Sequence, residues 1–431
     1  MFSNQREEVL SMNNLEKALQ HMEKGEADKA LALVESMLVK ATDDETFEIA
    51  DFYLSWGYYD EAATLFEKLL KDYEAEGQLI VKLAEIYIEL EEDERAVQLL
   101  NQVQRDDDFY LDALLYLGDL YQTQGLFEVT EEKLLEAKEL APEEIVIDFA
   151  LGEFLFSIGQ AARAIPFYEK VAEQSSELNG VNIEERLAEC HASIGHYESA
   201  LHLYDHIESD DPDTLFKHGF TAFQQHENQS AIHAWKRLID IDPYYYTVYP
   251  ELASALNETG QLQEAYEVAR KGISYDEFNK ELFFIAGQIA MKLGNTTEAM
   301  EHMQQAVTLD HDYKEAVLAL VELYKQQGMD EQIIDLLQTI KENGANDALY
   351  DWELGKANIE TEQFKAALKN YQDAYVFLED DSEFLKEYGF FLSEEGLFTE
   401  ALDLFTAYLK LEPLDHEVQE FVERLNDSNS F

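Results

Sequence analysis

The residues best suited to catalysis or metal binding lie between positions 190 and 206. His202 and His206 stand four residues apart, a spacing that puts two imidazoles on one side of a helix and can hold a metal ion. Cys190 and His191 precede them, but no spacing fixes a third ligand. The chain also has no glycine-rich phosphate loop, nucleophile elbow or HExxH motif. We therefore expect no catalytic residue, no metal site and no cofactor.

The elements that would position any functional residue repeat along the chain. Small residues recur early in the second of two amphipathic runs, and most of the gaps between them are 34 residues. The repeated positions are Ala30, Ala62, Ala96, Thr130, Ala164, Ala200, Ala231, Ala265, Ala299, Ile333, Ala367 and Ala401. This period predicts about twelve helical hairpins, each made of a helix A and a helix B.

Three further features recur at fixed offsets from these positions. A small residue lies at a matched position of helix A in every hairpin but the tenth, for example Gly152, Gly355 and Gly389. Most hairpins have a glycine between the two helices, and prolines such as Pro142 and Pro413 follow helix B. Small residues on both helices allow close approach, so the pair Val321 and Ile333 predicts that the tenth hairpin is splayed.

From Met12 to Pro413 the pattern resembles the tetratricopeptide repeat. The resemblance implies an all-α, right-handed α–α superhelix of about twelve hairpins, with a ligand groove lined mainly by helix A. After Pro413, apolar residues recur at helical spacing and predict a helix that caps the last hairpin. These residues are Leu414, Val418, Phe421, Val422 and Leu425.

Acidic residues occupy one position of helix A in five successive hairpins. This position, directly after the small residue, faces the groove in the resembled family. We call its acids the acidic column: Asp51, Glu85, Asp119, Glu153 and Glu189. The column predicts a site for a cationic segment, although acids on a solvated surface would give the same pattern.

Aromatic residues follow the acids along the chain. Phe216, Phe220 and Phe223 share a face of helix A in the seventh hairpin, and Phe284 lies in the ninth. Tyr246 and Tyr249 belong to a nearby tyrosine cluster. Such a stripe is typical of a core, but it would also suit an amphipathic helix or extended peptide.

The charge of the chain limits its partners. With 31 basic and 91 acidic residues the net charge is −60, which repels nucleic acid and anionic membranes and attracts cationic protein segments. The acids also serve solubility. Helix A has few lysines or arginines, Lys356 and Lys386 being isolated, so a clamp for the C-terminal carboxylate of a peptide is not expected.

The compartment and the chain start are inferred from a few residues. A single cysteine, Cys190, fits a reducing compartment, and no stretch has the length of a membrane span or a signal-peptide core. We expect a cytoplasmic protein without membrane insertion. The codons for residues 7–9 can form a ribosome-binding sequence, which suggests a bacterial source and a native start at Met12 rather than Met1.

The repeat pattern predicts four segments. Residues 1–11 form an extension without repeats, 12–173 hold hairpins 1–5, 174–412 hold hairpins 6–12, and 413–431 hold the capping helix and a frayed tail. The break near residue 174 is predicted from a polar connection and a shortened gap to the next repeat.

These observations favour a protein–protein interaction scaffold or assembly adaptor that binds a protein segment, basic or amphipathic, in its groove. The alternative is a regulatory receptor that senses a short peptide. A third class, an enzyme or metal protein built on the repeats, would need a polar pocket that the sequence does not display. Self-association is compatible with the repeats, and the sequence does not identify the partner.

Overall fold

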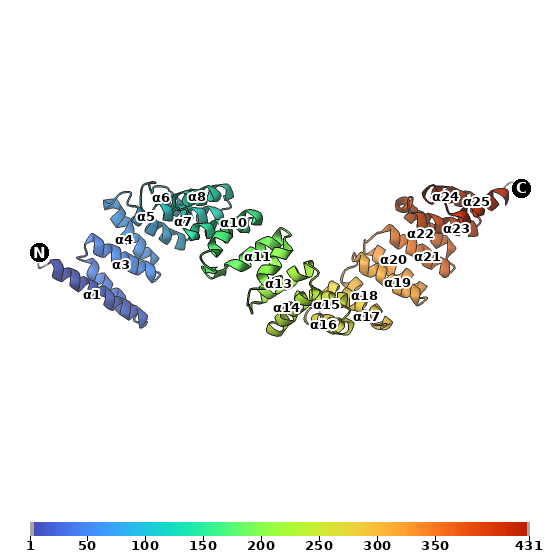
Figure 1. Ribbon diagram of the computed structural model, residues 1–431, viewed down its shortest axis with the longest axis horizontal. Helices are drawn as coiled ribbons and strands as arrows, with labels where there is room; N and C mark the ends of the chain where they lie inside the picture. The colour runs from blue at the N-terminus through green and yellow to red at the C-terminus, as the bar shows by residue number, and fades with distance from the viewer. Residues whose placement is uncertain (1–3, 429–431) are drawn as a thin grey trace. The chain divides into compact units, whose positions relative to one another are not determined.

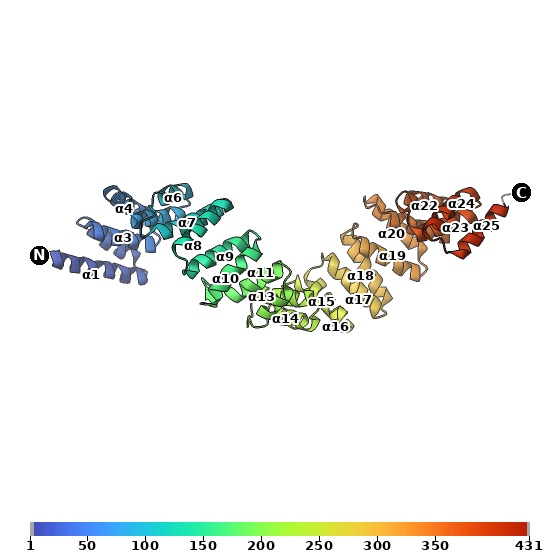
Figure 2. The same ribbon diagram turned by 45° about the horizontal axis from the view of Figure 1, so that its top comes forward.

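The structure, a computed structural model, describes the backbone of residues 4–428 and the side chains of residues 14–425. Apart from the connecting turns and one two-stranded hairpin, the described chain is helical. It divides into two compact units, and the boundary in the chain lies between Glu208 and Ser209. In Figures 1 and 2 the helices of each unit follow one another as consecutive antiparallel pairs. The expected all-α hairpin architecture is therefore confirmed.

The first unit contains six hairpins. Its elements are α1 (Asn4–Glu23), α2 (Ala27–Leu38), α3 (Asp43–Ser55), α4 (Tyr59–Asp72), α5 (Gly77–Glu89), α6 (Asp93–Leu100), α7 (Tyr110–Thr123), α8 (Phe127–Leu140), α9 (Ile145–Ser157), α10 (Ala161–Ala172), β1 (Glu177–Leu178), β2 (Val181–Asn182), α11 (Ile183–Ser193) and α12 (Tyr197–Tyr204).

The second unit contains six further hairpins and a final helix. Its elements are α13 (Pro212–Gln224), α14 (Asn228–Ile241), α15 (Val248–Glu258), α16 (Leu262–Tyr275), α17 (Lys280–Lys292), α18 (Thr296–Leu309), α19 (Lys314–Gln326), α20 (Asp330–Glu342), α21 (Ala348–Glu360), α22 (Phe364–Leu378), α23 (Ser382–Glu394), α24 (Phe398–Leu411) and α25 (His416–Ser428).

Helices A and B of a hairpin are held together by a small residue that meets a large one. A Cβ atom added to Gly152 would lie 2.9 Å from the ring of Tyr168, and one added to Gly219 would lie 2.4 Å from the indole of Trp235. Both aromatic side chains are fully buried, so neither hairpin has space for a larger residue at the glycine. The recurring small residues are therefore a condition of close packing within each hairpin.

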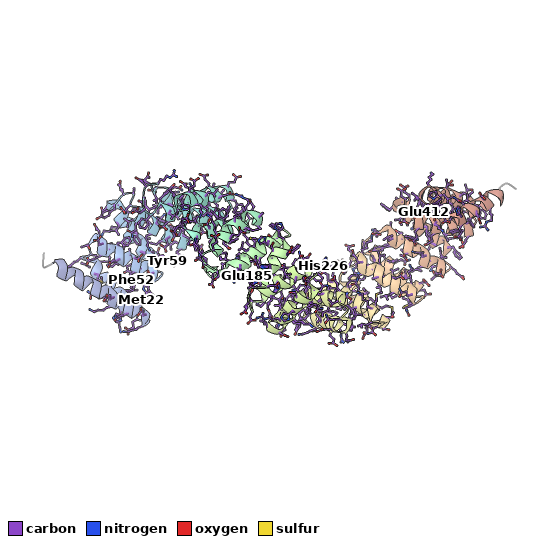
Figure 3. All side chains as sticks on the ribbon, viewed as in Figure 1. Met22, Phe52, Tyr59, Glu185, His226 and Glu412 are labelled. Carbon is purple, nitrogen blue, oxygen red and sulfur yellow. The ribbon has the colours of Figure 1, made fainter. Side chains whose placement is uncertain are left out.

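The turn between helices A and B uses a left-handed residue. Glycine fills this position in most hairpins, as at Gly125 (φ 73°). Where glycine is absent, Glu91, His226 (labelled in Figure 3) and Glu362 adopt the same conformation, with φ between 59° and 61°. Since this conformation costs non-glycine residues about 1 kcal/mol or more, the packing of the two helices, and not the residue type, imposes the turn.

Hairpin 10 departs from this packing as predicted. Of the described hairpins, α19 and α20 make the fewest close backbone approaches. Val321 and Ile333 are buried at the two positions that are small elsewhere, and their side chains hold the helices apart. The predicted splay of hairpin 10 is confirmed.

The predicted capping helix is α25. Val418 is fully buried, and the ring of Phe421 lies 5.1 Å from that of Phe390 and 5.5 Å from that of Phe405. Leu414 was wrongly included in this apolar face, because it precedes the helix and is 82% exposed. The expected frayed tail, residues 426–431, lies outside the described side chains.

The division into units differs from the predicted break near residue 174. That connection forms the β1–β2 hairpin, in which Glu177 pairs with Asn182, and α11 packs directly against α10. Hairpin 6 therefore belongs to the first unit. At the other end α1 begins at Asn4, within the predicted extension, of which residues 1–3 lie outside the described chain.

None of the described helices is both long and apolar enough to cross a membrane.

Candidate partner-binding surface

The first pair of the acidic column is held by a lysine from the neighbouring hairpin. Asp51 lies on α3 and Glu85 on α5, and Nζ of Lys82 lies 2.8 Å from the carboxylate of Asp51 and 3.8 Å from that of Glu85. Burial opposes the charge of Lys82, but its hydrogen bond to Asp51 and the charges of Asp51 and Glu85 together outweigh burial and raise the pKa of the lysine. The cluster joins hairpins 2 and 3.

The last pair of the column has the same arrangement around an arginine. Nε of Arg186 donates to Glu153 at 2.9 Å, and Nη1 donates to Glu189 at 2.7 Å. Burial opposes the charge of Arg186, yet the hydrogen bond to Glu189 and the charge of Glu153 prevail and raise the arginine pKa. Glu153 also accepts from the buried hydroxyl of Tyr168 at 2.6 Å. This cluster joins hairpins 5 and 6.

Asp119, in the middle of the column, differs from the other four acids. Its side chain is exposed on α7, and it takes part in no hydrogen bond or ion pair among the described residues. The structure therefore divides the predicted row into two ion-paired clusters and one solvated carboxylate. The sequence does carry a signal for this, because Lys82 and Arg186 each stand three residues before an acid of the column.

The predicted aromatic face of hairpin 7 is partly exposed. Phe220 on α13 is 38% exposed, whereas Phe216 and Phe223 are half-buried. The ring of Phe216 lies 5.4 Å from that of Tyr245, and the ring of Phe223 lies 5.8 Å from that of Trp235. Phe220 thus offers the largest free surface of the three.

The remaining aromatic candidates lie in different environments. Phe284 on α17 is half-buried, with its ring 5.1 Å from that of Tyr313, and Tyr246 is 51% exposed in the loop before α15. Tyr249 is fully buried, and its hydroxyl donates to the carbonyl of Pro243 at 2.8 Å. The placement of Tyr249 on a binding surface was wrong, because its ring is buried beside α16, with its centre 5.6 Å from that of Tyr275.

A cavity that the sequence did not predict lies over hairpins 10–12 of the second unit. Its volume is about 570 Å³, and its walls come mainly from α21 and α23, the A helices of hairpins 11 and 12, with Lys325 at the end of α19 and two residues of α20 on the side of hairpin 10. Its lining includes the charged and aromatic side chains of Lys325, Glu353, Lys356, Glu360, Glu387, Phe390 and Glu394. Lys356 and Phe390 occupy the same helix A position as the acidic column.

The lysines of this cavity converge on one carboxylate. Nζ of Lys356 lies 2.6 Å from Oε1 of Glu353, and Nζ of Lys325 lies 3.3 Å from Oε2. Lys325 also lies 3.5 Å from Glu322, and Lys356 lies 4.2 Å from the centre of the Trp352 ring. Burial opposes the charge of Lys325, but Glu353 outweighs it and the pKa of the lysine is raised.

The second internal carboxylate, Glu387, is bound by two hydrogen-bond donors. The indole Nε1 of Trp352 donates to its Oε1 at 2.9 Å, and the hydroxyl of Tyr371 donates to the same atom. Burial and the charge of Glu387 raise the pKa of Tyr371, so the phenol stays protonated. Both bonds end on Oε1, and within the described residues Oε2 accepts none.

The residues first considered for metal binding do not form a site. His202 is exposed on α12 and His206 is exposed in the turn that follows it, with ring centres 4.8 Å apart, and the described residues contain no group of three or more potential ligands that could hold a metal ion. Cys190 is fully buried in α11, and burial raises the pKa of its thiol to about 12. The thiol is therefore protonated and packed as a small apolar residue.

Comparison with protein families places the repeats in a known group. Residues 122–176 match the model described as YpiA-like, tetratricopeptide repeats, and residues 349–415 match YpiA-like, C-terminal tetratricopeptide repeats. Residues 54–117 and 290–351 match a general tetratricopeptide repeat model. The C-terminal match includes most of α21, which with α23 supplies much of the cavity wall.

Among solved structures, YrrB, a tetratricopeptide repeat protein with an unusual peptide-binding site, is 18% identical with a TM-score of 0.39, and the match covers 43% of this chain and 96% of YrrB. The Cut9 and Hcn1 complex of the APC/C gives 13% identity and a TM-score of 0.35, with 95% of each chain covered. These scores are too low to carry an argument about ligands.

Two curated relatives differ in how much they share with this chain. Lipopolysaccharide assembly protein B of Escherichia coli K12 is 26% identical over 59% of this chain and 60% of its own length. The TPR repeat-containing protein YpiA of Bacillus subtilis is 37% identical over 97% of this chain and its own full length. The chain therefore belongs to the YpiA-like family of tetratricopeptide repeat proteins, whose repeats serve as scaffolds for protein–protein interaction.

Proposed function

We propose that this protein is a cytoplasmic scaffold or assembly adaptor that binds a protein segment along the helix A surface of its hairpins. The observation that carries the proposal is the cavity over hairpins 10–12, because its wall combines charged and apolar side chains from three consecutive A helices. A surface that continues from one helix A to the next suits an extended peptide or an amphipathic helix.

The acidic column has a different part in this proposal from the one its sequence suggests. Asp51, Glu85, Glu153 and Glu189 bind Lys82 or Arg186 and so hold neighbouring hairpins together. Of the five acids, Asp119 is the one whose carboxylate is exposed without an ion pair among the described residues. We propose that a partner contacts Asp119 directly and meets the other four mainly as a background of negative charge.

The exposed aromatic residues extend the proposed contact surface in the second unit. Phe220 and Tyr246 offer free ring surface, and Phe216, Phe223 and Phe284 offer ring edges beside it. Tyr and Phe side chains contribute much of the binding energy at protein interfaces. Tyr249 is left out because it is buried.

The cytoplasmic location rests on the chemistry of Cys190. A lone, buried thiol gives the described chain no disulfide partner, and proteins of reducing compartments commonly have this pattern. Exclusive recovery of the protein from a secreted fraction would contradict this part of the proposal.

Site-specific photo-crosslinking in cells of the source species tests the surface. A photoreactive amino acid at Glu360, exposed on α21 at the cavity rim, should form adducts with a defined partner. The matched control is the same amino acid at Phe377, which is 78% exposed on α22 of the same hairpin. Adducts that form only from position 377 would show that the helix B surface binds the partner instead.

A further inference from the structure

We infer that the cavity over α19, α21 and α23 holds a cationic side chain of the bound segment, and that arginine fits it best. The inference rests on the proposed function, because it names the chemistry of one position in the segment. It depends on three observations: the opened hairpin that enlarges the cavity, the charges of its wall and the oxygen of Glu387 that accepts no hydrogen bond.

The cavity adjoins hairpin 10, the least closely packed of the described hairpins. Gly355 and Gly389 bring their helices against Tyr371 and Phe405, with an added Cβ only 2.9 Å and 2.8 Å from those rings. Val321 stands at the equivalent position of hairpin 10, where the helices are splayed, and Ile333 of α20 lines the cavity. Space for a long side chain therefore follows from two residues that are larger than their counterparts in the other hairpins.

The charges of the wall favour a cation. Five carboxylates and two ammonium groups line the cavity. Both ammonium groups form ion pairs with Glu353, and Lys325 also forms one with Glu322. Neither lysine can therefore bind an anionic ligand without breaking an ion pair. Glu360 and Glu394 are exposed at the rim and have no described partner. The carboxylates beyond Glu353 therefore leave the cavity negative.

Glu387 provides a fixed acceptor. Its Oε1 is held by the indole of Trp352 and the phenol of Tyr371, and this leaves Oε2 to accept from a ligand. A carboxylate whose orientation is fixed loses little side-chain entropy when it binds a cation. Hydrogen bonds between a guanidinium and a carboxylate are also stronger than those between neutral groups.

Phe390 gives the cavity an aromatic wall. The ring is half-buried and is fixed by edge-to-face contacts, with its centre 5.0 Å from that of Phe405 and 5.1 Å from that of Phe421. A planar guanidinium can lie on such a ring while it donates to a carboxylate, whereas a lysine ammonium uses the two contacts less well. Ile359 adds apolar surface for the methylene groups.

The experiment uses the indole NH of Trp352 as a reporter. In the full chain labelled with ¹⁵N-tryptophan, three indole signals are expected, and Trp352→Phe identifies the one that belongs to position 352. Because this NH is bonded to Glu387, a cation at the carboxylate should shift its signal, while the signals of Trp56 and Trp235 stay in place. The probes are blocked pentapeptides with central arginine, citrulline or glutamate, and an acetylated peptide with a free C-terminal carboxylate.

Substitutions of single carboxylates test whether Glu387, rather than a neighbouring acid, is the acceptor of the cation. In Glu387→Gln the amide oxygen can keep the bonds to Trp352 and Tyr371, while the amide nitrogen replaces the free carboxylate oxygen and removes the acceptor. We expect the arginine peptide to bind this variant about tenfold more weakly, and citrulline to replace arginine with a similar loss. Glu394→Gln should weaken binding less. The matched control is Glu395→Gln, the next residue, which is exposed and outside the cavity wall, and it should bind as the natural chain does.

Other results would overturn the inference. Equal binding of citrulline and arginine would show that charge is not recognised. Tighter binding of the free carboxylate peptide would assign the cavity to an anion held by Lys325 and Lys356. If no peptide shifts the Trp352 signal while position 360 still forms crosslinks, the cation inference fails and the proposed function stands. If those crosslinks are also absent, the proposed function fails.

Discussion

The helix A surface of hairpins 2–6 and that of hairpins 10–12 are built from the same residue types but use them differently. In the first unit one cation binds two acids of the column: Lys82 binds Asp51 and Glu85, and Arg186 binds Glu153 and Glu189. In the second unit two lysines bind the single carboxylate of Glu353. In hairpins 2–6 the acids join neighbouring hairpins, whereas in hairpins 10–12 further acids line a cavity.

The two regions also differ in how their hairpins close. Hairpin 5 has Gly152 against the ring of Tyr168, so its two helices pack closely. Hairpin 10 has Val321 and Ile333 at the small positions and adjoins the cavity. A row of acids in a repeat sequence therefore does not identify a binding groove, since the neighbouring cations and the fit of each hairpin decide whether the acids can reach a ligand.

The strongest test opens a closed hairpin. Gly152→Val places side-chain atoms inside the ring of Tyr168, which an added Cβ alone would approach to 2.9 Å, and should lower the free energy of unfolding by about 3 kcal/mol. Urea unfolding followed by circular dichroism, with hydrogen exchange to locate the loss in α9 and α10, measures it. Gly152→Ala should cost less. A valine variant as stable as the natural chain would show that close packing at this position is not required.

Removal of a shared cation is expected to have the next largest effect. Arg186→Met leaves Glu153 and the mostly buried Glu189 without their shared ion pair and should cost about 2 kcal/mol, between the values for exposed and buried pairs. Faster amide exchange in α9 and α11 would report the loss. Arg105→Met is the control, because Arg105 is exposed and lies 4.0 Å from its nearest carboxylate. Equal effects of the two variants would contradict a joining role for Arg186.

The paired lysines of the second unit predict a smaller effect. Lys356→Met removes one of two cations on Glu353 and the contact with Trp352, and should cost about 1 kcal/mol because Lys325 remains. Denaturant unfolding compares it with Lys365→Met, an exposed lysine of α22 in the same hairpin. A loss as large as that of Arg186→Met would remove the difference between the two regions.

The smallest stability change is expected at the solvated acid. Asp119→Asn should alter the free energy of unfolding by less than about 0.5 kcal/mol, since its carboxylate is exposed and has no described partner. Binding of the crosslinked partner, measured at low and high salt, should weaken in this variant at low salt. A clear loss of stability without a change in binding would make Asp119 a structural residue.

Much of the fold was predictable from local rules. The spacing of small residues, the turn glycines and the closing prolines indicated the hairpins, and even the splay of hairpin 10 followed from Val321 and Ile333. The assignment of Leu414 to the capping face failed because helical spacing was extended to a residue two positions before the helix begins at His416. Tyr249 was misplaced because it packs against Gly272 and Tyr275 of α16, a contact between two helices that spacing within one helix does not reveal.

The sequence by itself determined the repeat, the hairpins and the excess of negative charge, because each of these depends on residues close together in the chain. Only the tertiary structure decided which acids are ion-paired, since Lys82 and Arg186 reach acids about 30 residues earlier as well as three residues later. It also decided where a cavity opens. The position of the cavity depends on how three hairpins pack. A cavity is a space that the packed side chains leave unfilled, and no pattern of residues in the sequence marks it.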